Sequence, residues 1–144
     1  MFQSSLSSTP PAVLLPDVID VVSEAGAMIR AEFHRFGGPR GIGSKAPIDI
    51  EVEEFLKVRL LGLHFCGFVG EETDAVHNPS QDIWVVDPQD GTTEFLAGRR
   101  GAAISVALLR NGLPVLGVVY APVAPDDQGD LIAWAEGTNL TRNG

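Results

Sequence analysis

The stretch Ile83–Phe95, IWVVDPQDGTTEF, joins a predicted buried strand to an acidic turn. Its first four residues are apolar, and the run ends at Asp87, where Pro88 removes a backbone donor and restricts its neighbour. Asp90 follows three residues after Asp87, and Gly91 allows the backbone angles of a tight turn. The sequence therefore places two carboxylates and free backbone amides at the end of one strand.

An acidic turn of this kind suits a hard divalent cation. Mg2+ prefers oxygen ligands and often takes one or two carboxylates together with phosphate oxygens, so a phosphate ester is the natural substrate class. The same residues also fit a simpler interpretation, a strand-to-turn junction whose aspartates hydrogen-bond their own backbone. The stretch alone leaves both interpretations open.

A second apolar run ends in acid in the same way. The run Phe65–Val69 leads into Gly70, Glu71 and Glu72. If the two strands are neighbours in one sheet, Glu71 and Asp87 lie at corresponding strand ends, within reach of one shared ion. The pair of acidic strand ends favours the metal interpretation.

Two amphipathic helices are predicted before these strands. The first spans Pro16–Phe36 and the second Asp49–His64, because apolar residues recur at i, i+3, i+4 and i+7 in both. Asp49 stands where an N-cap belongs. Glu53 and Lys57, four residues apart, are predicted to pair on the solvated face of the second helix.

The sequence pattern of the second half of the chain predicts antiparallel strands. Ala102–Arg110 and Leu113–Pro122 flank Asn111-Gly112, which is a strong signal for a hairpin turn. Leu131–Glu136 is a third strand, and residues 137–144 are predicted to be a tail. Helices followed by hairpin-linked strands indicate an α+β fold, with two helices packed on one face of a largely antiparallel sheet.

The composition is that of one globular domain. The chain has 144 residues, of which 44% are hydrophobic, enough for a proper core. We expect a flexible tail over residues 1–13 and a domain over residues 14–144. Cys66, the single cysteine, excludes an intramolecular disulfide and is expected in the core. Trp84 and Trp134 are expected to be core aromatics.

The net charge of −9 argues against a nucleic-acid polymer or an acidic membrane as partner, since both are bound through an excess of Lys and Arg. A metal ion in an acidic site would reverse the local field and admit a small phosphorylated metabolite. The start of the chain lacks the basic region of a secretory signal, and no apolar run is long enough to span a membrane, so we expect a cytoplasmic protein.

Three segments, in this order and spacing, resemble the inositol monophosphatase family of Mg2+-dependent phosphatases. They are VGEE at 69–72, WVVDPQDGTTEF at 84–95 and PVLGVVYAP at 114–122. The Glu94-Phe95 ending is more similar to the 3'(2'),5'-bisphosphate nucleotidase branch, and Thr93 to the inositol phosphatase branch. The resemblance implies the N-terminal metal-binding lobe of the family, the first half of its layered α/β/α/β sandwich.

The resemblance also implies a metal site with two or more Mg2+ ions, for which Mn2+ could substitute. The ligands would be Glu71, Asp87, Asp90 and the main-chain carbonyl of Gln89, with Asp87 bridging two ions. Glu72 would support this cluster from beside it.

The remaining implied roles concern substrate and water. Asp90, Gly91, Thr92 and Thr93 would bind the substrate, and Glu71, Thr92 and Asp49 would act in catalysis by orienting the attacking water. The implied reaction is hydrolysis of a phosphomonoester, either an inositol-1-phosphate or a 3'-phosphonucleotide, without a covalent enzyme intermediate.

Two departures from the family pattern matter. The family has a longer segment between its loop lysine and the helix-start aspartate, whereas Lys45 lies only four residues before Asp49. The WDxAAG motif of the second half is also absent, so the chain is expected to be the N-terminal lobe alone. Such a truncated lobe would expose an apolar face and self-associate or take up a complementing lobe.

Two alternatives remain beside the metal-dependent phosphatase. A haloacid-dehalogenase-type phosphatase also ends an apolar strand in a nucleophilic aspartate, but its partner stands two residues on, whereas Asp87 and Asp90 are three apart. A catalytically inactive interaction or structural domain would retain the fold without the reaction.

Overall fold

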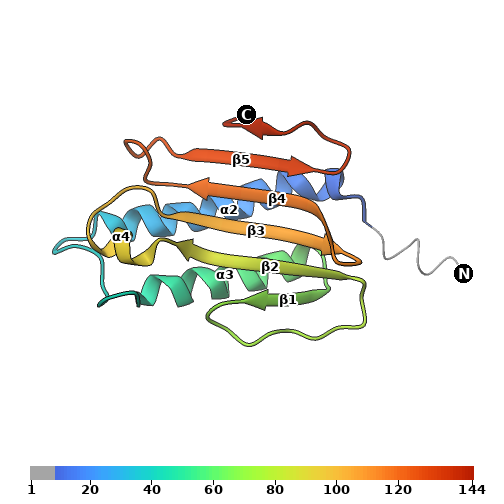
Figure 1. The fold of residues 1–144 in the computed structure, drawn as a ribbon, viewed down its shortest axis with the longest axis horizontal. Coiled ribbons are helices and arrows are strands. Elements are labelled where there is room, and N and C mark those ends of the chain that lie inside the picture. The colour runs from blue at the N-terminus through green and yellow to red at the C-terminus, as the bar shows by residue number, and fades with distance from the viewer. Residues whose placement is uncertain (1–8) are drawn as a thin grey trace, which may run out of the picture.

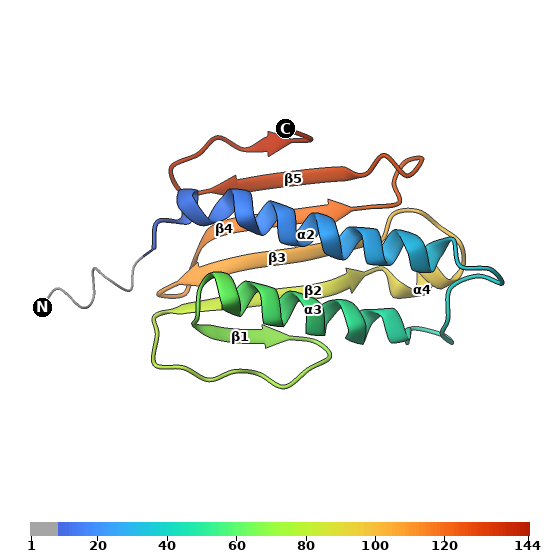
Figure 2. The same ribbon diagram turned by 180° about the vertical axis from the view of Figure 1, so that it is seen from behind.

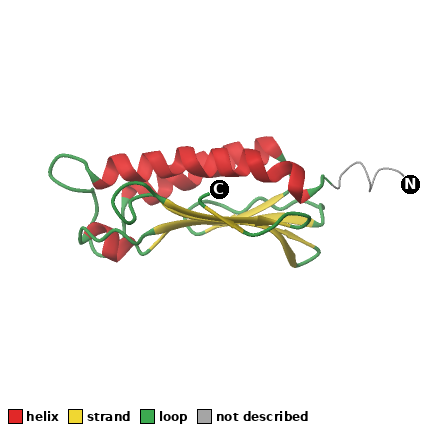
Figure 3. Cartoon of the chain, turned by 90° about the horizontal axis from the view of Figure 1, so that it is seen from above, coloured by secondary structure: helices red, strands yellow, loops and turns green. Residues whose placement is uncertain are grey.

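Two long helices lie across one face of a six-stranded sheet (Figures 1 and 3). The computed structural model describes residues 9–144. The elements are α2 Pro11–Phe33, α3 Pro47–Leu63, β1 Gly67–Gly70, β2 Asp82–Asp90, α4 Thr92–Leu96, β3 Ala103–Arg110, β4 Leu113–Ala121, β5 Asp130–Ala135 and β6 Thr141–Arg142. The predicted α+β fold, with two helices on a largely antiparallel sheet, is confirmed.

The strands follow one another across the sheet in chain order, β1 to β6. Strands β1 and β2 are parallel, with Phe68 opposite Trp84, and all other neighbours are antiparallel. The predicted hairpin is β3 and β4, joined at Asn111 and Gly112, which both take positive φ values. Because β1 and β2 are parallel, their carboxyl ends meet at one edge of the sheet, as the metal interpretation requires.

Helix α2 begins at Pro11, before the predicted start at Pro16, and ends at Phe33. The residues Pro11–Val13, which we assigned to a flexible tail, form its first turn, so that boundary was wrong. Proline suits the first helical position because its missing N–H has no intrahelical partner there. Residues 1–8 of the predicted tail lie outside the described residues.

The start of α3 also differs from the prediction. The helix begins at Pro47 with Ala46 as N-cap, so Asp49 lies in the first turn instead of capping it. Proline fixes the first helical residue two positions earlier than expected. The carboxylate of Asp49 is thereby free to bond groups outside its own helix.

Two short elements were not predicted. Thr92–Leu96 forms the one-turn helix α4, and Thr141–Arg142, inside the predicted tail, forms β6 beside β5. The guanidinium of Arg142 bonds both carboxylate oxygens of Asp130 at 2.9 and 2.8 Å, which ties β6 to β5.

The core lies between the helices and the sheet (Figure 2). A row of buried side chains crosses the sheet toward the helices: Phe68, Trp84, Leu108, Leu116 and Ala135. The buried Cys66 lies in the same core, where burial raises the pKa of its thiol to about 11.

On the opposite face of the sheet, no helix of residues 9–144 is packed (Figure 3). The neighbouring row of residues is half-buried or exposed there: Val69, Val85, Ala107, Gly117 and Trp134. Trp84 is a core aromatic as predicted, but Trp134 is not, because it alternates with the buried Ala133 and Ala135 and so faces outward. Among the described residues, no helix is long and apolar enough to cross a membrane.

Two contacts hold helix α2 against the end of β4: the close packing of Gly26 on Tyr120, and hydrogen bonds from Arg30. A Cβ at Gly26 would overlap the ring of Tyr120, so glycine lets the ring lie against the helix. One turn later, Arg30 donates to the Tyr120 hydroxyl at 2.9 Å and to the carbonyl of Pro122 at 3.0 Å.

A buried ion cluster closes the far end of the sheet, where β2 begins. The carboxylate of Asp82 is bonded by Arg110 at 2.8 and 2.9 Å and by His64 at 2.7 Å. Burial raises the pKa of Asp82, but the bonds from Arg110 and His64 outweigh burial and hold that pKa below its usual range. The cluster joins the end of α3 to β2 and β3.

Replacing Gly26 by alanine tests the contact between α2 and Tyr120. At an open helix position this change stabilises by up to about 1 kcal/mol, but here the methyl group meets the ring. We expect the free energy of unfolding in urea to fall by about 1 to 3 kcal/mol, the usual range for overpacking. Gly62→Ala in α3 is the matched control, because nothing lies within 4 Å of its Cβ. Equal stability of the two variants would contradict the close contact.

Acid should remove the stabilisation that Asp82 provides. Because its folded pKa is depressed, its contribution is complete above the unfolded value of about 3.9 and is lost as the pH falls through the folded pKa. We expect Asp82→Asn to cost about 3 kcal/mol of unfolding free energy at about pH 7 and progressively less as the pH falls below the unfolded pKa of about 3.9. Asp130→Asn, at an exposed ion pair, should change stability little over the same pH range. A cost for Asp82→Asn that does not vary with pH would contradict this assignment.

Candidate functional site

The predicted site residues gather at the sheet edge where β1 and β2 end (Figure 1). Glu71 and Glu72 follow β1, Asp87 and Asp90 stand near the end of β2, and Asp49 comes from the first turn of α3. Three separate segments of the chain thus deliver carboxylates to one edge.

The carboxylate of Asp49 is the centre of a buried network. Its Oδ1 accepts a hydrogen bond from Gln89 Nε2 at 2.9 Å, and its Oδ2 accepts one from Thr92 Oγ1 at 2.8 Å. Asp49 is 5% exposed and Gln89 is 4% exposed. Thr92 and Asp49, which the family resemblance paired, are therefore in direct contact despite the short segment before Asp49.

The turn between Asp87 and Asp90 interrupts the sheet. Asp87 pairs with Ser105 and Asp90 with Ala103, and the register shifts between them. Gly91 takes a φ of 94°, which starts α4 and which other residues rarely adopt. Asp87 Oδ1 accepts the N–H of Gln89 at 3.1 Å, so the aspartate does bond its own backbone, as the simpler interpretation of this stretch expected.

Burial and mutual repulsion raise the pKa values of the carboxylates at this edge. Burial raises the pKa of Glu71, and the nearby charges of Asp87 and Glu72 raise it further. Burial also raises the pKa of Asp87, with a contribution from Asp90, although the backbone N–H of Gln89 opposes the shift. Burial is likewise the largest cause of the raised pKa of Asp49. A cation among these groups would relieve their repulsion.

The donor set fits a hard cation in its chemistry. The predicted ligands offer carboxylate and carbonyl oxygens, which suit Mg2+ better than a metal that prefers nitrogen or sulfur. In residues 9–144, however, no three His, Cys, Asp or Glu side chains are grouped closely enough to hold an ion as they stand. The ligands are thus assembled at one edge, but their side chains do not form a ready-made cage.

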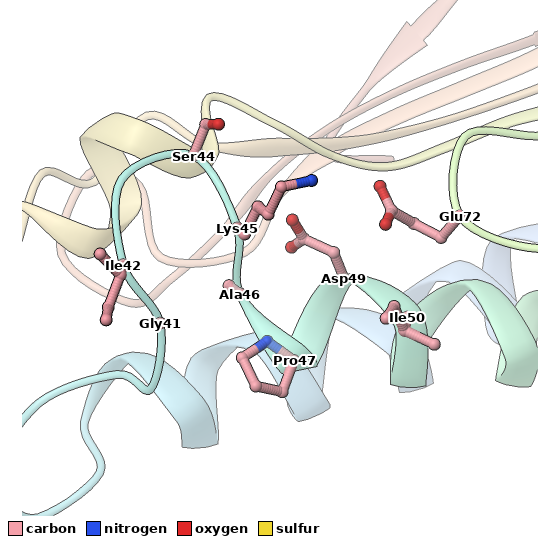
Figure 4. Close-up of a pocket in the computed structure, with 9 residues that line it drawn as sticks. All are labelled: Gly41, Ile42, Ser44, Lys45, Ala46, Pro47, Asp49, Ile50 and Glu72. Atoms are coloured by element: carbon pink, nitrogen blue, oxygen red, sulfur yellow. The ribbon is translucent and has the colours of Figure 1, made fainter.

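A cavity of about 700 Å3 opens beside Asp49 (Figure 4). The side chains of Lys45, Asp49 and Glu72 point into the same space, and the rest of the lining comes from the loop before α3 and from Ile50. Asp49 therefore borders the cavity and also contacts Thr92.

The glycine-rich loop before α3 contains a tight bridge. Ile42 and Lys45 exchange backbone hydrogen bonds of 3.0 and 3.1 Å. A Cβ at Gly41 would overlap the carbonyl of Lys45, so only glycine fits there. The bridge leads the chain directly into Pro47, which explains how a short loop still places Asp49 in the site.

Glu53 is the functional residue that the sequence interpretation missed. The predicted pair with Lys57 on a solvated face is wrong, because Glu53 is fully buried. Its carboxylate accepts the N–H groups of Glu71 at 2.8 Å, Glu72 at 3.0 Å and Thr73 at 2.6 Å, and the Thr73 hydroxyl at 2.6 Å. A signal was available, since Glu53 lies four residues after Asp49 and so on the same helix face.

The close approach of Glu53 also explains the glycine that ends β1. A Cβ at Gly70 would overlap the Glu53 carboxylate. Gly70 thus lets the carboxylate reach the amides that follow it, and this fixes the path of the backbone that carries Glu71 and Glu72.

The comparisons with known proteins agree with this geometry. The model of the inositol monophosphatase family matches residues 17–144. Inositol monophosphatase 1 of Solanum lycopersicum is 34% identical over 116 residues, which cover 73% of this chain and 41% of that protein. The 3'(2'),5'-bisphosphate nucleotidase CysQ of Aggregatibacter actinomycetemcomitans is 31% identical over 120 residues, covering 76% of this chain and 44% of that protein.

The fold has a counterpart among solved structures. The extragenic suppressor protein suhB of Bartonella henselae superposes with a TM-score of 0.78 at 27% identity, covering 92% of this chain and 52% of that one. This chain spans about half the length of the relatives it matches. From the extent of the family match and from these relatives, we conclude that the chain belongs to the inositol monophosphatase family.

Proposed function

We propose that this chain carries the metal-binding half of a Mg2+-dependent phosphomonoesterase. The substrate would be a small phosphorylated metabolite of the inositol-1-phosphate or 3'-phosphonucleotide type. The observation that carries the proposal is the bond from Thr92 to Asp49, 2.8 Å long, next to the carboxylates that end β1 and β2. The relatives support both substrate types, since one is an inositol monophosphatase and another a bisphosphate nucleotidase.

The hydroxyl of Thr92 is the group that would hold the attacking water. A threonine hydroxyl has one proton, and that of Thr92 has two acceptors within reach: Asp49 Oδ2 at 2.8 Å and the carbonyl oxygen of Gln89 at 3.2 Å. We assign the proton to the shorter contact, with Asp49. The lone pairs of the Thr92 oxygen then remain to accept a hydrogen bond from water. Glu71, at the end of the neighbouring strand, would orient the same water from its other side.

The metal would be held by Glu71, Asp87, Asp90 and the carbonyl of Gln89, with Glu72 beside them. A bound Mg2+ or Mn2+ would lower the pKa of a water and neutralise phosphoryl oxygens. Asp90, Thr93 and the backbone of Gly91 and Thr92 would receive the substrate at the turn.

Neither alternative gains support. The family match covers residues 17–144 and does not point to a haloacid-dehalogenase-type enzyme. The hydrogen bond from Thr92 to Asp49 supports a catalytic role, because an inactive structural domain would have no need to keep these two side chains together.

Replacing Asp90 by asparagine tests the ligand assignment. The change removes a charged oxygen ligand while keeping the shape of the side chain. We expect the affinity for Mg2+ and Mn2+, measured by calorimetry, to fall at least about tenfold, and any Mg2+-dependent phosphate release to be abolished. Asp126→Asn, in an exposed turn far along the chain, is the matched control. Unchanged metal affinity in Asp90→Asn would reject Asp90 as a ligand.

We further propose that the bare face of the sheet is covered by a second protein layer. The exposed side chains there include Val69, Val85, Val119 and Ile132, between 37% and 44% exposed. A continuous apolar face of this kind is rare on a monomer. Self-association of the chain, or the docking of a complementing lobe, would bury it.

A lysine at Val119 tests this surface. Val119 lies in β4 on the uncovered face and 44% of it is exposed, so a charge there should prevent a second layer from packing. In sedimentation we expect the unmodified chain to self-associate and Val119→Lys to shift toward the monomer. Val58→Lys, on the exposed side of α3, should behave as the unmodified chain does. A clean monomer that binds no hydrophobic dye would contradict the proposal.

A further inference from the structure

The side chain of Gln89 occupies an unusual position for an amide. It lies near the end of β2, between Asp87 and Asp90, and is 4% exposed. Its Nε2 donates to Asp49 at 2.9 Å, whereas its Oε1 has no hydrogen-bond partner within residues 9–144. Burying an amide carries a desolvation cost that an apolar side chain would not. The bond to Asp49 is therefore the contact that distinguishes glutamine from an apolar residue here.

The carboxylate of Asp49 needs a fixed orientation if it is to accept the hydroxyl proton of Thr92. The amide of Gln89 donates to Oδ1 of Asp49, and this leaves Oδ2 directed at the Thr92 hydroxyl, 2.8 Å away. The same hydroxyl lies 3.2 Å from the main-chain carbonyl of Gln89, a longer contact that does not depend on the Gln89 side chain. The competing direction is the cavity, where the side chain of Lys45 lies beside Asp49 (Figure 4). Without the amide, the carboxylate can rotate about its Cβ–Cγ bond toward that ammonium.

We propose that the Gln89 side chain is a positioning residue, which clamps the Asp49 carboxylate so that it accepts the hydroxyl proton of Thr92. The role goes beyond the backbone carbonyl of Gln89, which was assigned to the metal. It deepens the proposed function and rests on it, since an oriented Thr92 hydroxyl matters because it would hold the attacking water. The bond geometry itself can be tested without metal or substrate.

The test uses Gln89→Met, which keeps the length of the side chain and removes its amide. In the metal-free protein we expect the NMR signals of the Gln89 amide to move on Asp49→Asn. We expect the hydroxyl proton of Thr92 to exchange slowly in the unmodified chain and rapidly in Gln89→Met. If Gln89 only fills space, the Thr92 hydroxyl will exchange equally slowly in both, which overturns the proposal. Gln128→Met, in an exposed loop, is the matched control.

A double-mutant cycle adds a measurement that tolerates a loss of overall stability. Gln89→Met and Thr92→Val should be coupled through Asp49, so that their joint effect on the unfolding constant departs at least about fivefold from the product of the single effects. In an Asp49→Asn background the coupling should disappear. If Gln89→Met and Thr92→Val are not coupled when Asp49 is present, the proposed clamp is wrong. It is also wrong if their coupling is unchanged in the Asp49→Asn background.

Mn2+ affinity separates this inference from the proposed function. If the unmodified chain binds no Mn2+ in calorimetry, the proposed function fails, while the exchange and coupling measurements still decide the clamp. If it binds Mn2+ but Gln89→Met leaves the Thr92 exchange unchanged, the clamp fails and the proposed function stands.

Discussion

The carboxylate of Glu53 is the constraint on which the arrangement of the site depends. A buried charge is costly unless it is fully bonded, and here three backbone N–H groups and one hydroxyl bond it. These bonds tie α3 to the chain that leaves β1. Because the same helix carries Asp49 one turn earlier, a single anchoring contact sets the distance between Asp49 and the acids Glu71 and Glu72. Strand β2, parallel to β1, then brings Asp87 to the same edge.

The sequence predicted those parts of the molecule that depend on neighbouring residues. The hairpin of β3 and β4 follows from Asn111-Gly112, whose positive φ values suit a tight turn. The acidic strand ends were recognisable because an apolar run that stops at a carboxylate must leave the core at that point. The repeated pattern predicted that they would meet at one edge if the two strands were neighbours, and the parallel pairing of β1 with β2 meets that condition.

The parts that the sequence did not predict depend on distant partners. By local rules Asp49 suits a helix cap and Glu53 suits a solvated ion pair, yet their bonds go to residues 18 to 43 positions away. Trp134 is a large apolar residue of the kind usually found in a core. In β5, however, successive side chains point to opposite faces of the sheet, and Trp134 lies on the uncovered face. Strand β6 is two residues long, too short to produce a pattern. In each case the tertiary partner outweighed local propensity.

Because each strand pairs with its neighbour in the chain, the two halves of the fold differ in when their contacts become available during synthesis. The site residues, from Asp49 to Thr93, form one continuous segment, so all of them have been synthesised before β3 to β6 emerge. Helix α2 is made first and packs on α3, but its contacts with β4 and β5 can form only after β3 has been synthesised. The growing chain thus contains every residue of the acidic edge before its first helix meets β4 and β5, and in that interval the part of α2 that packs on these strands stays uncovered.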